Sequence, residues 1–472
     1  MSSDLHFLPA WKMAELVRSR AISPVELVKS HLNRIGELNP KLNAYVQVDS
    51  EHALAQARTA EAALARGAEL GPLHGVPISI KSSIDVAGMR CEAGTKLRAG
   101  HVAEHDAPLV SRLRKAGAIV LGVTNTPELL MAWETENLLY GRTNNPWDLS
   151  RTAGGSSGGE AAAVASGCSA GGVGSDGGGS IRVPAHFCGI CGLKPTPGRI
   201  PATGHFPQSV GPFALLGVVG PMARTVRDLK LLFEVMQGPD VGDPSAAPVP
   251  VRWRDEGGLK KIRIGYFEDD GRTRVTPETR SAVRRAAKAL QSAGFEIEPF
   301  RPDGLEKARQ LWWKIFGVAG GMLLGPMLRG HETELSPILK QFSGWVAEET
   351  PHTAQTLLDT WIERDVVRMQ IFGQMERVPV MLCPVAAVPA FRHGEREWQI
   401  DGQTVKYLDA WSYCEWFNLL GMPAATVPAA RSADGLPIGV QIVAVPWQEE
   451  AALEIAEVIE AQCGDLGQPS AV

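Results

Sequence analysis

The feature that most constrains this chain is a glycine-rich stretch at residues 151–197. It carries two serines, Ser156 and Ser180, each directly preceded by glycine. Glycine has no Cβ, so the backbone beside these serines can approach other parts of the chain closely. A charged residue, Lys81, stands alone within an apolar run elsewhere in the chain. A lysine that acts as a base, a serine that relays a proton and a serine that attacks together indicate acyl transfer.

Apolar runs bounded by turn residues predict strands, and apolar residues at helical spacing predict helices between them. We expect helices at residues 53–65, 277–293 and 448–461, and a helix that starts after Ser23. Strands are expected at residues 75–82, 117–122, 261–266, 295–300, 378–385 and 438–445. Strands that alternate with helices predict an α/β sheet with parallel character.

The chain shows no clear domain boundary, so we expect one large domain over residues 1–472. Its core is expected at about residues 65–240 and 375–465. The region at about 305–375 is helical and rich in bulky apolar side chains, which predicts a helical cap. This cap either only packs on the sheet or also lines an apolar substrate channel.

Composition excludes several classes of protein. With a net charge of −5 and no local cluster of Lys and Arg, the chain gives no electrostatic case for binding nucleic acid or an anionic membrane. Its seven cysteines are thinly spread, which argues against a disulfide scaffold and favours a reducing compartment. The N-terminal segment lacks a signal-peptide pattern, and the apolar run at 379–391 is too short to span a bilayer. We therefore expect a soluble, cytoplasmic protein.

Three short motifs fit other functions poorly. Residues 172–177 match G-x-G-x-x-G, but they lack the preceding strand and the later acidic residue of a dinucleotide site. Residues 154–158 match G-x-S-x-G, but a polar, proline-containing loop stands where a hydrolase elbow needs a strand. Cys188 and Cys191 form a lone C-x-x-C, which we interpret as two buried thiols rather than a zinc or redox site.

The strongest signal for a site is the run from Asp176 to Ser180, in which three glycines precede the serine. Successive N–H groups there can converge on an anion, such as the oxyanion that forms if Ser180 attacks a carbonyl. A flexible turn is the alternative. Lys81 stands among isoleucines, where burial would favour the neutral amine that acts as a base. The alternative there is a lysine at a strand end with its amine in water.

Together these segments strongly resemble the amidase signature family. The resemblance covers nearly the whole chain and is weakest at residues 240–375. It implies the fold of that family, a single large domain with a central mixed, twisted sheet surrounded by helices. The segments that carry it are Gly75-Val-Pro-Ile-Ser-Ile-Lys81, Gly154-Gly-Ser-Ser-Gly-Gly-Glu160, Asp176-Gly-Gly-Gly-Ser-Ile-Arg-Val-Pro-Ala185, Cys188-Gly-Ile-Cys-Gly-Leu-Lys-Pro195, Asn418-Leu-Leu-Gly-Met-Pro-Ala424 and Leu436-Pro-Ile-Gly-Val-Gln441.

Carried over position by position, the resemblance implies a catalytic triad of Lys81, Ser156 and Ser180. Ser180 would be the nucleophile, and a cis peptide bond would precede Ser156. No metal or cofactor is implied. Three further polar residues would support the triad and the glycine loop: Ser157, Asp176 and Arg182. The oxyanion hole would consist of the N–H groups of Gly177, Gly178, Gly179 and Ser180. Many relatives carry a larger aliphatic residue where this chain has Gly177.

We therefore expect a serine hydrolase of C–N bonds that forms an acyl-enzyme with a small-molecule amide. The bulky residues of the cap favour an apolar or aryl amide, while carbamates, anilides and esters stay open. The runner-up is a protein like the glutamine-hydrolysing subunit of an amidotransferase, which would need a stable partner. A non-catalytic binding protein is the third alternative, and a homodimer is left open. The candidate substrate pocket consists of Leu130, Met131, Trp133, Trp312 and Phe316.

Overall fold

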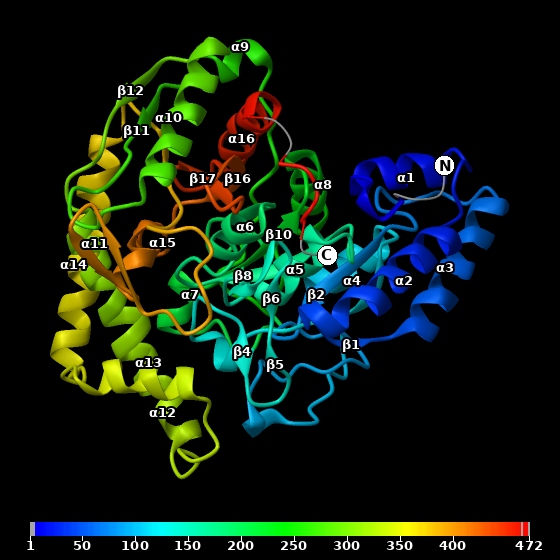
Figure 1. Ribbon diagram of the computed structural model, residues 1–472, viewed down its shortest axis with the longest axis horizontal. Coiled ribbons are helices and arrows are strands. Elements are labelled where there is room, and N and C mark those ends of the chain that lie inside the picture. Colours follow the sequence, from blue (N-terminus) through cyan, green and yellow to red (C-terminus); the bar gives the residue numbers. More distant parts are fainter. Residues whose placement is uncertain (1–4, 464–465, 471–472) are drawn as a thin grey trace.

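A mixed sheet of eleven strands forms the centre of the protein (Figure 1), for which the computed structural model describes residues 5–463 and 466–470. In spatial order the strands are β1 (Tyr45–Val48), β3 (Ile119–Thr124), β2 (Pro77–Lys81), β8 (Gly171–Asp176), β10 (Val218–Ala223), β9 (Cys191–Lys194), β16 (Ala424–Arg431), β17 (Pro437–Ala444), β13 (Val380–Pro384), β11 (Ile264–Tyr266) and β12 (Ile297–Pro299). The expected mixed α/β sheet in a single domain is confirmed.

Parallel pairing is confined to two parts of this sheet. β2 runs parallel to β3 and β8, and β11 runs parallel to β12 and β13, whereas the other neighbours are antiparallel. All six strands predicted from the sequence are present. Five other strands of this sheet were not predicted, among them β8, whose glycine-rich sequence shows little alternation of side chains. A Cβ on Gly172 of β8 would stand 1.9 Å from Oε1 of Glu160, so glycine lets a helix pack closely on this strand.

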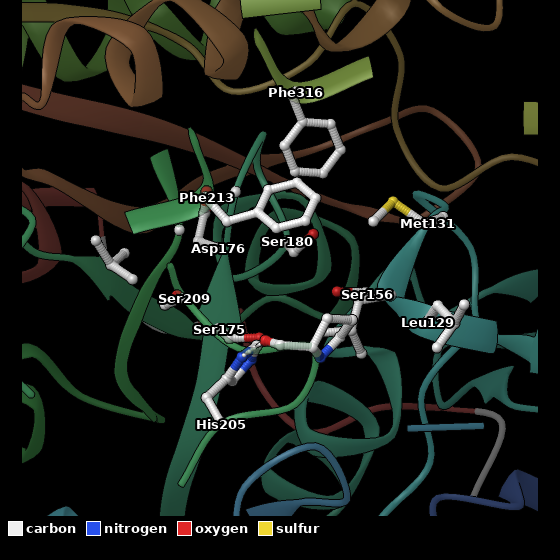
Figure 2. A pocket seen from close by; sticks show the side chains of 15 residues that line it. Leu129, Met131, Ser156, Ser175, Asp176, Ser180, His205, Ser209, Phe213 and Phe316 are labelled. Atoms are coloured by element: carbon white, nitrogen blue, oxygen red, sulfur yellow. Dashed lines mark hydrogen bonds between the residues drawn. The ribbon is translucent and has the colours of Figure 1, made fainter. Parts of the chain in front are cut away.

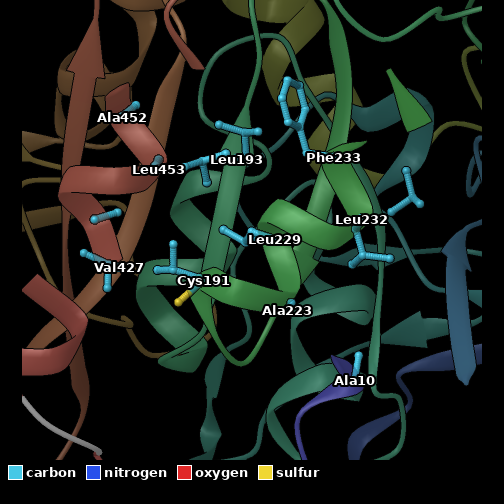
Figure 3. Close-up of a cluster of buried hydrophobic side chains, with 14 of the residues drawn as sticks. Ala10, Cys191, Leu193, Ala223, Leu229, Leu232, Phe233, Val427, Ala452 and Leu453 are labelled. Carbon is cyan, nitrogen blue, oxygen red and sulfur yellow. The ribbon is translucent and has the colours of Figure 1, made fainter. Parts of the chain in front are cut away.

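Helices cover both faces of the sheet. On one face lie α1 (Ala10–Arg18), α4 (Pro108–Lys115), α8 (Val226–Met236), α10 (Pro277–Ser292) and α16 (Glu449–Cys463). Figure 3 shows this core, where Leu229 and Phe233 of α8 lie near Leu193 of β9, and Ala452 and Leu453 of α16 lie near Val427 of β16. On the other face lie α2 (Pro24–Leu42), α3 (Ser50–Ala65), α5 (Gly158–Ala165), α6 (Arg182–Cys188), α7 (Pro212–Leu216) and α15 (Ser412–Leu420).

The start of α2 follows the predicted signal. Ser23 Oγ accepts hydrogen bonds from the N–H groups of Val25 and Glu26, and Glu26 Oε2 accepts one from the Ser23 N–H at 3.0 Å. This reciprocal arrangement is a capping box, with Pro24 in the first helical position. Pro127 precedes the short 3₁₀ turn η3 (Glu128–Leu130).

The predicted cap is helical throughout its main elements: α11 (Leu305–Trp312), the π-helical turn η4 (Trp313–Ala319), α12 (Gly320–Leu328), α13 (Pro337–Ala347) and α14 (Ala354–Gln374). The continuous stretch Leu305–Leu328 is long and apolar enough to cross a membrane by length and composition, with a mean hydropathy of 1.3. The sequence pattern had pointed only to the shorter run at 379–391. Because 44% of its apolar window is buried inside the protein, and core helices pass the same test, this stretch is weak evidence for a span.

Smaller elements complete the chain. They are η1 (Leu5–Phe7), η2 (Lys96–Arg98), α9 (Glu256–Leu259), η5 (Asp409–Trp411) and three two-stranded ribbons formed by β4 (Glu136–Asn137) with β5 (Gly141–Arg142), β6 (Asn144–Asn145) with β7 (Asp148–Thr152), and β14 (Glu397–Ile400) with β15 (Gln403–Lys406).

The alternation of β2 determines where Lys81 points. Successive side chains of a strand face opposite sides of a sheet. Ile78 and Ile80 belong to the core beneath α4 and α8, whereas Ser79 and Lys81 face α5. The isoleucines next to Lys81 in sequence therefore do not surround its amine, contrary to the sequence interpretation; the amine is buried by the opposite face of the sheet.

Candidate active site

Lys81 is fully buried, and its amine lies among three serine hydroxyls. Lys81 Nζ is 2.7 Å from Ser156 Oγ, 3.1 Å from Ser157 Oγ and 3.0 Å from Ser175 Oγ. Ser156 and Ser157 directly precede α5, and Ser175 lies on β8, which pairs with β2. The sequence predicted the approach of Ser156 and Ser157 to Lys81. It missed Ser175, whose signal was its position beside Asp176 at the end of a strand that had not been recognised.

Burial of Lys81 favours the neutral form of its amine. It lowers the pKa of the amine from the ordinary value of 10.5 to about 7, although the nearby carboxylates of Asp176 and Glu160 act in the opposite direction. A neutral amine has two N–H donors and one lone pair. Three hydroxyl partners match that set, since two can accept hydrogen bonds and the third can donate its proton to the nitrogen.

Glu160 lies behind Lys81 on α5. Its carboxylate accepts hydrogen bonds from the hydroxyls of Ser79 and Thr124, the latter at 2.8 Å, and Thr124 is paired with Lys81 across the sheet. Burial raises the pKa of Glu160 to about 7 against the effect of these bonds and of Lys81. The Glu160 carboxyl group is thus held by Ser79 and Thr124, and within the described residues it makes no hydrogen bond to Lys81.

Ser156 and Ser180 face one cavity (Figure 2). The peptide bond between Gly155 and Ser156 is cis, as the family resemblance implied. Among the residues that the structure describes, no hydrogen bond joins the two hydroxyls, although both line the cavity. Catalytic hydrogen bonds are often longer before substrate binds, so this geometry is compatible with a proton relay.

A buried ion pair holds the glycine loop, residues 177–179. Arg182 binds Asp176 in a fork, with Nη2 2.9 Å from Oδ1 and Nε 3.0 Å from Oδ2. Although burial acts to raise the pKa of Asp176, the guanidinium of Arg182 holds it well below its usual range. Asn418 Nδ2 donates to Asp176 Oδ1 at 3.0 Å, and Gln441 Oε1 accepts from Arg182 at 3.0 Å. Asn418 and Gln441 lie in two of the recognised segments, but the sequence assigned them no role.

The glycine loop and Ser180 together carry four N–H groups, of which one is bound within the described residues. The Gly179 N–H donates to Asp176 Oδ1 at 2.8 Å, so this amide is already occupied. Within the described residues, the N–H groups of Gly177, Gly178 and Ser180 have no protein acceptor. Gly179 also has a φ of +116°, which favours glycine because a Cβ there would be strained. The four donors expected from the sequence therefore become three available ones.

The cavity is small and mostly apolar, with a volume of about 50 Å³. In Figure 2, Phe213 and Phe316 lie at one end and His205 at the other, with the two serines between them. His205 is partly buried and its pKa is lowered by burial to about 4, so the ring is neutral at neutral pH. The lining residues are Leu129, Leu130, Met131, Ser156, Ser175, Asp176, Gly177, Ser180, His205, Pro207, Ser209, Phe213, Gly217, Val218 and Phe316.

Three of the five predicted pocket residues line this cavity: Leu130, Met131 and Phe316. Trp133 and Trp312 do not; they contact the glycine loop from outside it. The sequence missed His205 and Phe213, which come from a loop and a short helix with no distinctive motif. Only their position in the folded chain brings them to the serines.

The other motifs take the places expected of structural elements. Cys188 and Cys191 are free, buried thiols whose pKa values are raised by burial, and the other five cysteines are also free and buried. Residues 172–177 form a strand and the turn after it rather than a phosphate loop before a helix. In the described parts of the chain, no three His, Cys, Asp or Glu side chains gather in a way that could hold a metal ion.

Comparisons with known proteins show the family of the chain. The family model Amidase matches residues 26–453. The chain is 36% identical to an indoleacetamide hydrolase of Bradyrhizobium diazoefficiens, over 97% of this chain and 88% of that protein. It is 32% identical to a glutamyl-tRNA(Gln) amidotransferase subunit of Carboxydothermus hydrogenoformans, over 97% of each. The solved structure of a bacterial aryl acylamidase of the amidase signature family superposes with a TM-score of 0.86 at 28% identity, covering 98% of this chain and 97% of that one.

Proposed function

This chain belongs to the amidase signature family and is a hydrolase of C–N bonds in amides, and on that premise we propose that it cleaves apolar or aryl amides through an acyl-enzyme on Ser180. The single observation that carries the proposal is the buried amine of Lys81, which lies 2.7 Å from Oγ of Ser156, a residue that lines the same cavity as Gly177 and Ser180. Beside it, the N–H groups of Gly177, Gly178 and Ser180 have no protein acceptor within the described residues.

The first half of the reaction forms an ester. Neutral Lys81 accepts the proton of Ser156 while Ser156 accepts that of Ser180, and Ser180 Oγ attacks the amide carbonyl carbon. The carbonyl oxygen becomes an oxyanion that the N–H groups of Gly177, Gly178 and Ser180 bind; each such donor is worth about 3 kcal/mol of barrier. The proton then returns through Ser156 to the leaving nitrogen, the C–N bond breaks and the amine departs.

The second half repeats the relay with water. Lys81 accepts a proton through Ser156 from a water molecule, which adds to the ester carbonyl, and the same three N–H groups bind the second oxyanion. Collapse of this intermediate returns the proton to Ser180 Oγ and releases the carboxylic acid. Every proton in the cycle moves among Lys81, Ser156, Ser180, the leaving nitrogen and the attacking water molecule.

The lining of the cavity supports an apolar acyl group. Leu129, Met131, Phe213 and Phe316 are among its apolar lining residues. Asp176, the only charged side chain among the described lining residues, is bound by Arg182. Ligand pockets commonly measure about 300–1,000 Å³. A cavity of about 50 Å³ therefore holds only a small acyl group unless the phenylalanines move.

The same lining disfavours glutamine. A glutamine substrate carries an ammonium and a carboxylate group. Each of these would need a side chain of opposite charge or several hydrogen-bond partners in the pocket. Likeness to an amidotransferase subunit keeps this alternative open, and we carry it as the second candidate.

A panel of substrates distinguishes the two candidates. Purified protein is assayed with an acetanilide, an aryl acetamide, a short aliphatic amide, an aryl carbamate and glutamine, with release of amine or ammonia as the readout. We expect kcat/KM for the aryl amides to exceed that for glutamine by about 100-fold or more, since a polar substrate would leave its charges unpaired in an apolar pocket. Preference for glutamine would reject the apolar-amide assignment.

Enlarging the apolar end of the cavity is expected to change substrate preference. Phe213→Ala removes a ring that packs against Phe316 at 5.6 Å, and we expect the ratio of kcat/KM for a bulky aryl amide over acetamide to rise about tenfold. Phe342→Ala is the matched control, because Phe342 also packs against Phe316, at 6.4 Å, but does not line the cavity. If this ratio rises equally in both variants, or changes in neither, the acyl group binds elsewhere.

A further inference from the structure

Two tryptophans bind the outer side of the glycine loop. Trp312 Nε1 donates to the carbonyl oxygen of Gly177 at 2.8 Å, and Trp133 Nε1 donates to that of Gly178 at 2.8 Å. Both indoles are almost fully buried, with relative exposures of 1% and 4%. An indole has a single donor, and both are directed at consecutive peptide groups of the loop.

Peptide geometry links these bonds to the reacting side of the loop. The carbonyl of one residue and the N–H of the next belong to one planar trans peptide and point in opposite directions. When Trp312 holds the Gly177 carbonyl outward, the Gly178 N–H is directed to the other side, where it has no protein acceptor among the described residues. When Trp133 holds the Gly178 carbonyl, the Gly179 N–H is directed at Asp176 Oδ1.

The carbonyl of Gly179 and those of the two residues that flank the loop, Asp176 and Ser180, are bound as well. Asn418 Nδ2 donates to Asp176 O at 3.2 Å, the Val183 N–H donates to Gly179 O at 2.7 Å, and the Ser157 N–H donates to Ser180 O at 3.1 Å. Within this set, only the two tryptophan bonds come from segments without recognised motif residues: the loop after η3 and the end of α11.

Glycine at positions 177 and 178 allows the rings of Phe316 and Trp312 to pack against the loop. A Cβ on Gly177 would stand 2.8 Å from Phe316, and one on Gly178 would stand 2.5 Å from Trp312. Phe316 and Trp312 are stacked with ring centroids 4.8 Å apart, and the π-helical turn η4 begins directly after Trp312. A larger side chain in place of Gly177 would occupy the space that Phe316 fills here.

We propose that Trp312, with Trp133 beside it, is a positioning residue of the oxyanion hole: its indole N–H orients the Gly177–Gly178 peptide so that the Gly178 N–H meets the developing oxyanion. The inference rests on the proposed acyl-enzyme mechanism and deepens it. It also makes the cap part of the reacting site, since the residue that orients the loop belongs to the same helical stretch as Phe316, which lines the substrate cavity.

Trp312→Phe tests the inference because it keeps an aromatic ring and removes the N–H. Alanine is unsuitable there, because Trp312 is 1% exposed, stacks on Phe316 and lines a second cavity of about 610 Å³, so the loss of its ring would also remove packing. With the best amide of the panel, we expect Trp312→Phe to lower kcat about 10- to 100-fold, as misplacing a catalytic group by a fraction of an ångström does, and to leave KM within about twofold.

A pair of inhibitors separates positioning from general damage. Ser180 Oγ attacks the carbonyl carbon of a phenethyl trifluoromethyl ketone. The serine proton passes through Ser156 to Lys81, and the ketone oxygen becomes an oxyanion. The corresponding secondary alcohol binds without forming one. We expect Trp312→Phe to weaken the ketone by the same factor as kcat and to leave the alcohol unchanged. Equal weakening of both would mean a merely structural role and would overturn the inference.

Trp313→Phe is the matched control. Trp313 is the next residue, and its Nε1 donates to Glu349 at the surface, so its variant is expected to keep the kcat of the parent protein. If Trp312→Phe does not fold, Trp133→Phe serves as the second variant, with the same pattern expected. Parent-like kcat and ketone affinity in the folded Trp variants, with Ser180→Ala inactive, would reject this inference alone. An active Ser180→Ala would instead reject the mechanism on which it rests.

Discussion

Replacing Ser180 with alanine is expected to lower kcat/KM for every amide of the panel by about 10⁴-fold or more, because no acyl-enzyme can form without the attacking oxygen. The variant is expected to fold normally. Ser180 is 9% exposed, and within the described residues its hydroxyl makes no hydrogen bond to the protein, so its removal leaves no buried polar group unpaired. The checks are steady-state kinetics and thermal unfolding of the same preparations.

Ser209→Ala is the matched control for this prediction, since Ser209 is a second serine that lines the cavity but does not adjoin the glycine loop. It is expected to retain activity within a few-fold. A fluorophosphonate probe is expected to add its mass to the peptide that contains Ser180 and to none in Ser180→Ala. Substantial turnover by Ser180→Ala, or labelling of a different serine, would remove Ser180 from its proposed role.

Replacing Lys81 with methionine is expected to lower kcat/KM about 10³- to 10⁴-fold, because the relay then has no group to accept the proton. In the parent protein, Lys81 accepts a proton only when neutral. With its pKa lowered to about 7, kcat/KM is expected to rise with pH through about 7 and to level off above that. An acidic limb near pH 4 would instead assign the base to His205, whose pKa is about 4.

The same shift predicts a dependence of stability on pH that does not rely on activity. The folded state holds Lys81 with a pKa of about 7, below the unfolded value of 10.5, so the unfolded chain binds more protons between these values. Its contribution to the free energy of unfolding therefore rises with pH across that window, by at most about 1.4 kcal/mol per pH unit, and is constant below pH 7. Denaturant unfolding of the parent and of Lys81→Met measures this difference.

Lys194 provides the matched control. It is also fully buried, with a pKa lowered by burial to about 7, but its amine donates to Pro195 O and touches none of the serines. Lys194→Met is expected to alter the pH dependence of stability as Lys81→Met does, while the activity and its acidic limb persist. If the fall of kcat/KM below about pH 7 disappears in Lys194→Met but persists in Lys81→Met, the roles of the two lysines are exchanged.

Six strands of the central sheet and the start of α2 could be predicted from local sequence patterns. The strands at β2, β3, β11, β12, β13 and β17 carry β-branched or other apolar side chains at short spacing, and Ser23, Pro24 and Glu26 mark the start of α2 by their own hydrogen bonds. β8 was missed because its sequence, GGVGSD, has almost no side chains to show an alternation. Gly172 allows Glu160 of α5 to approach this strand closely, and Gly174 does the same for Ser157; both are contacts between segments that are distant in the sequence.

The family, the α/β class and the three residues proposed for the chemistry could be read from the linear chain, because glycine-flanked serines and a lone lysine in an apolar run carry their signal locally. Only the packed chain shows which way Lys81 points, that Ser175 joins its partners, that the Gly179 amide is already occupied, and that Trp133 and Trp312 bind the loop rather than line the pocket. Each of these depends on directions of side chains and carbonyls across different elements, and a linear pattern does not encode such directions until the sheet and the cap have packed.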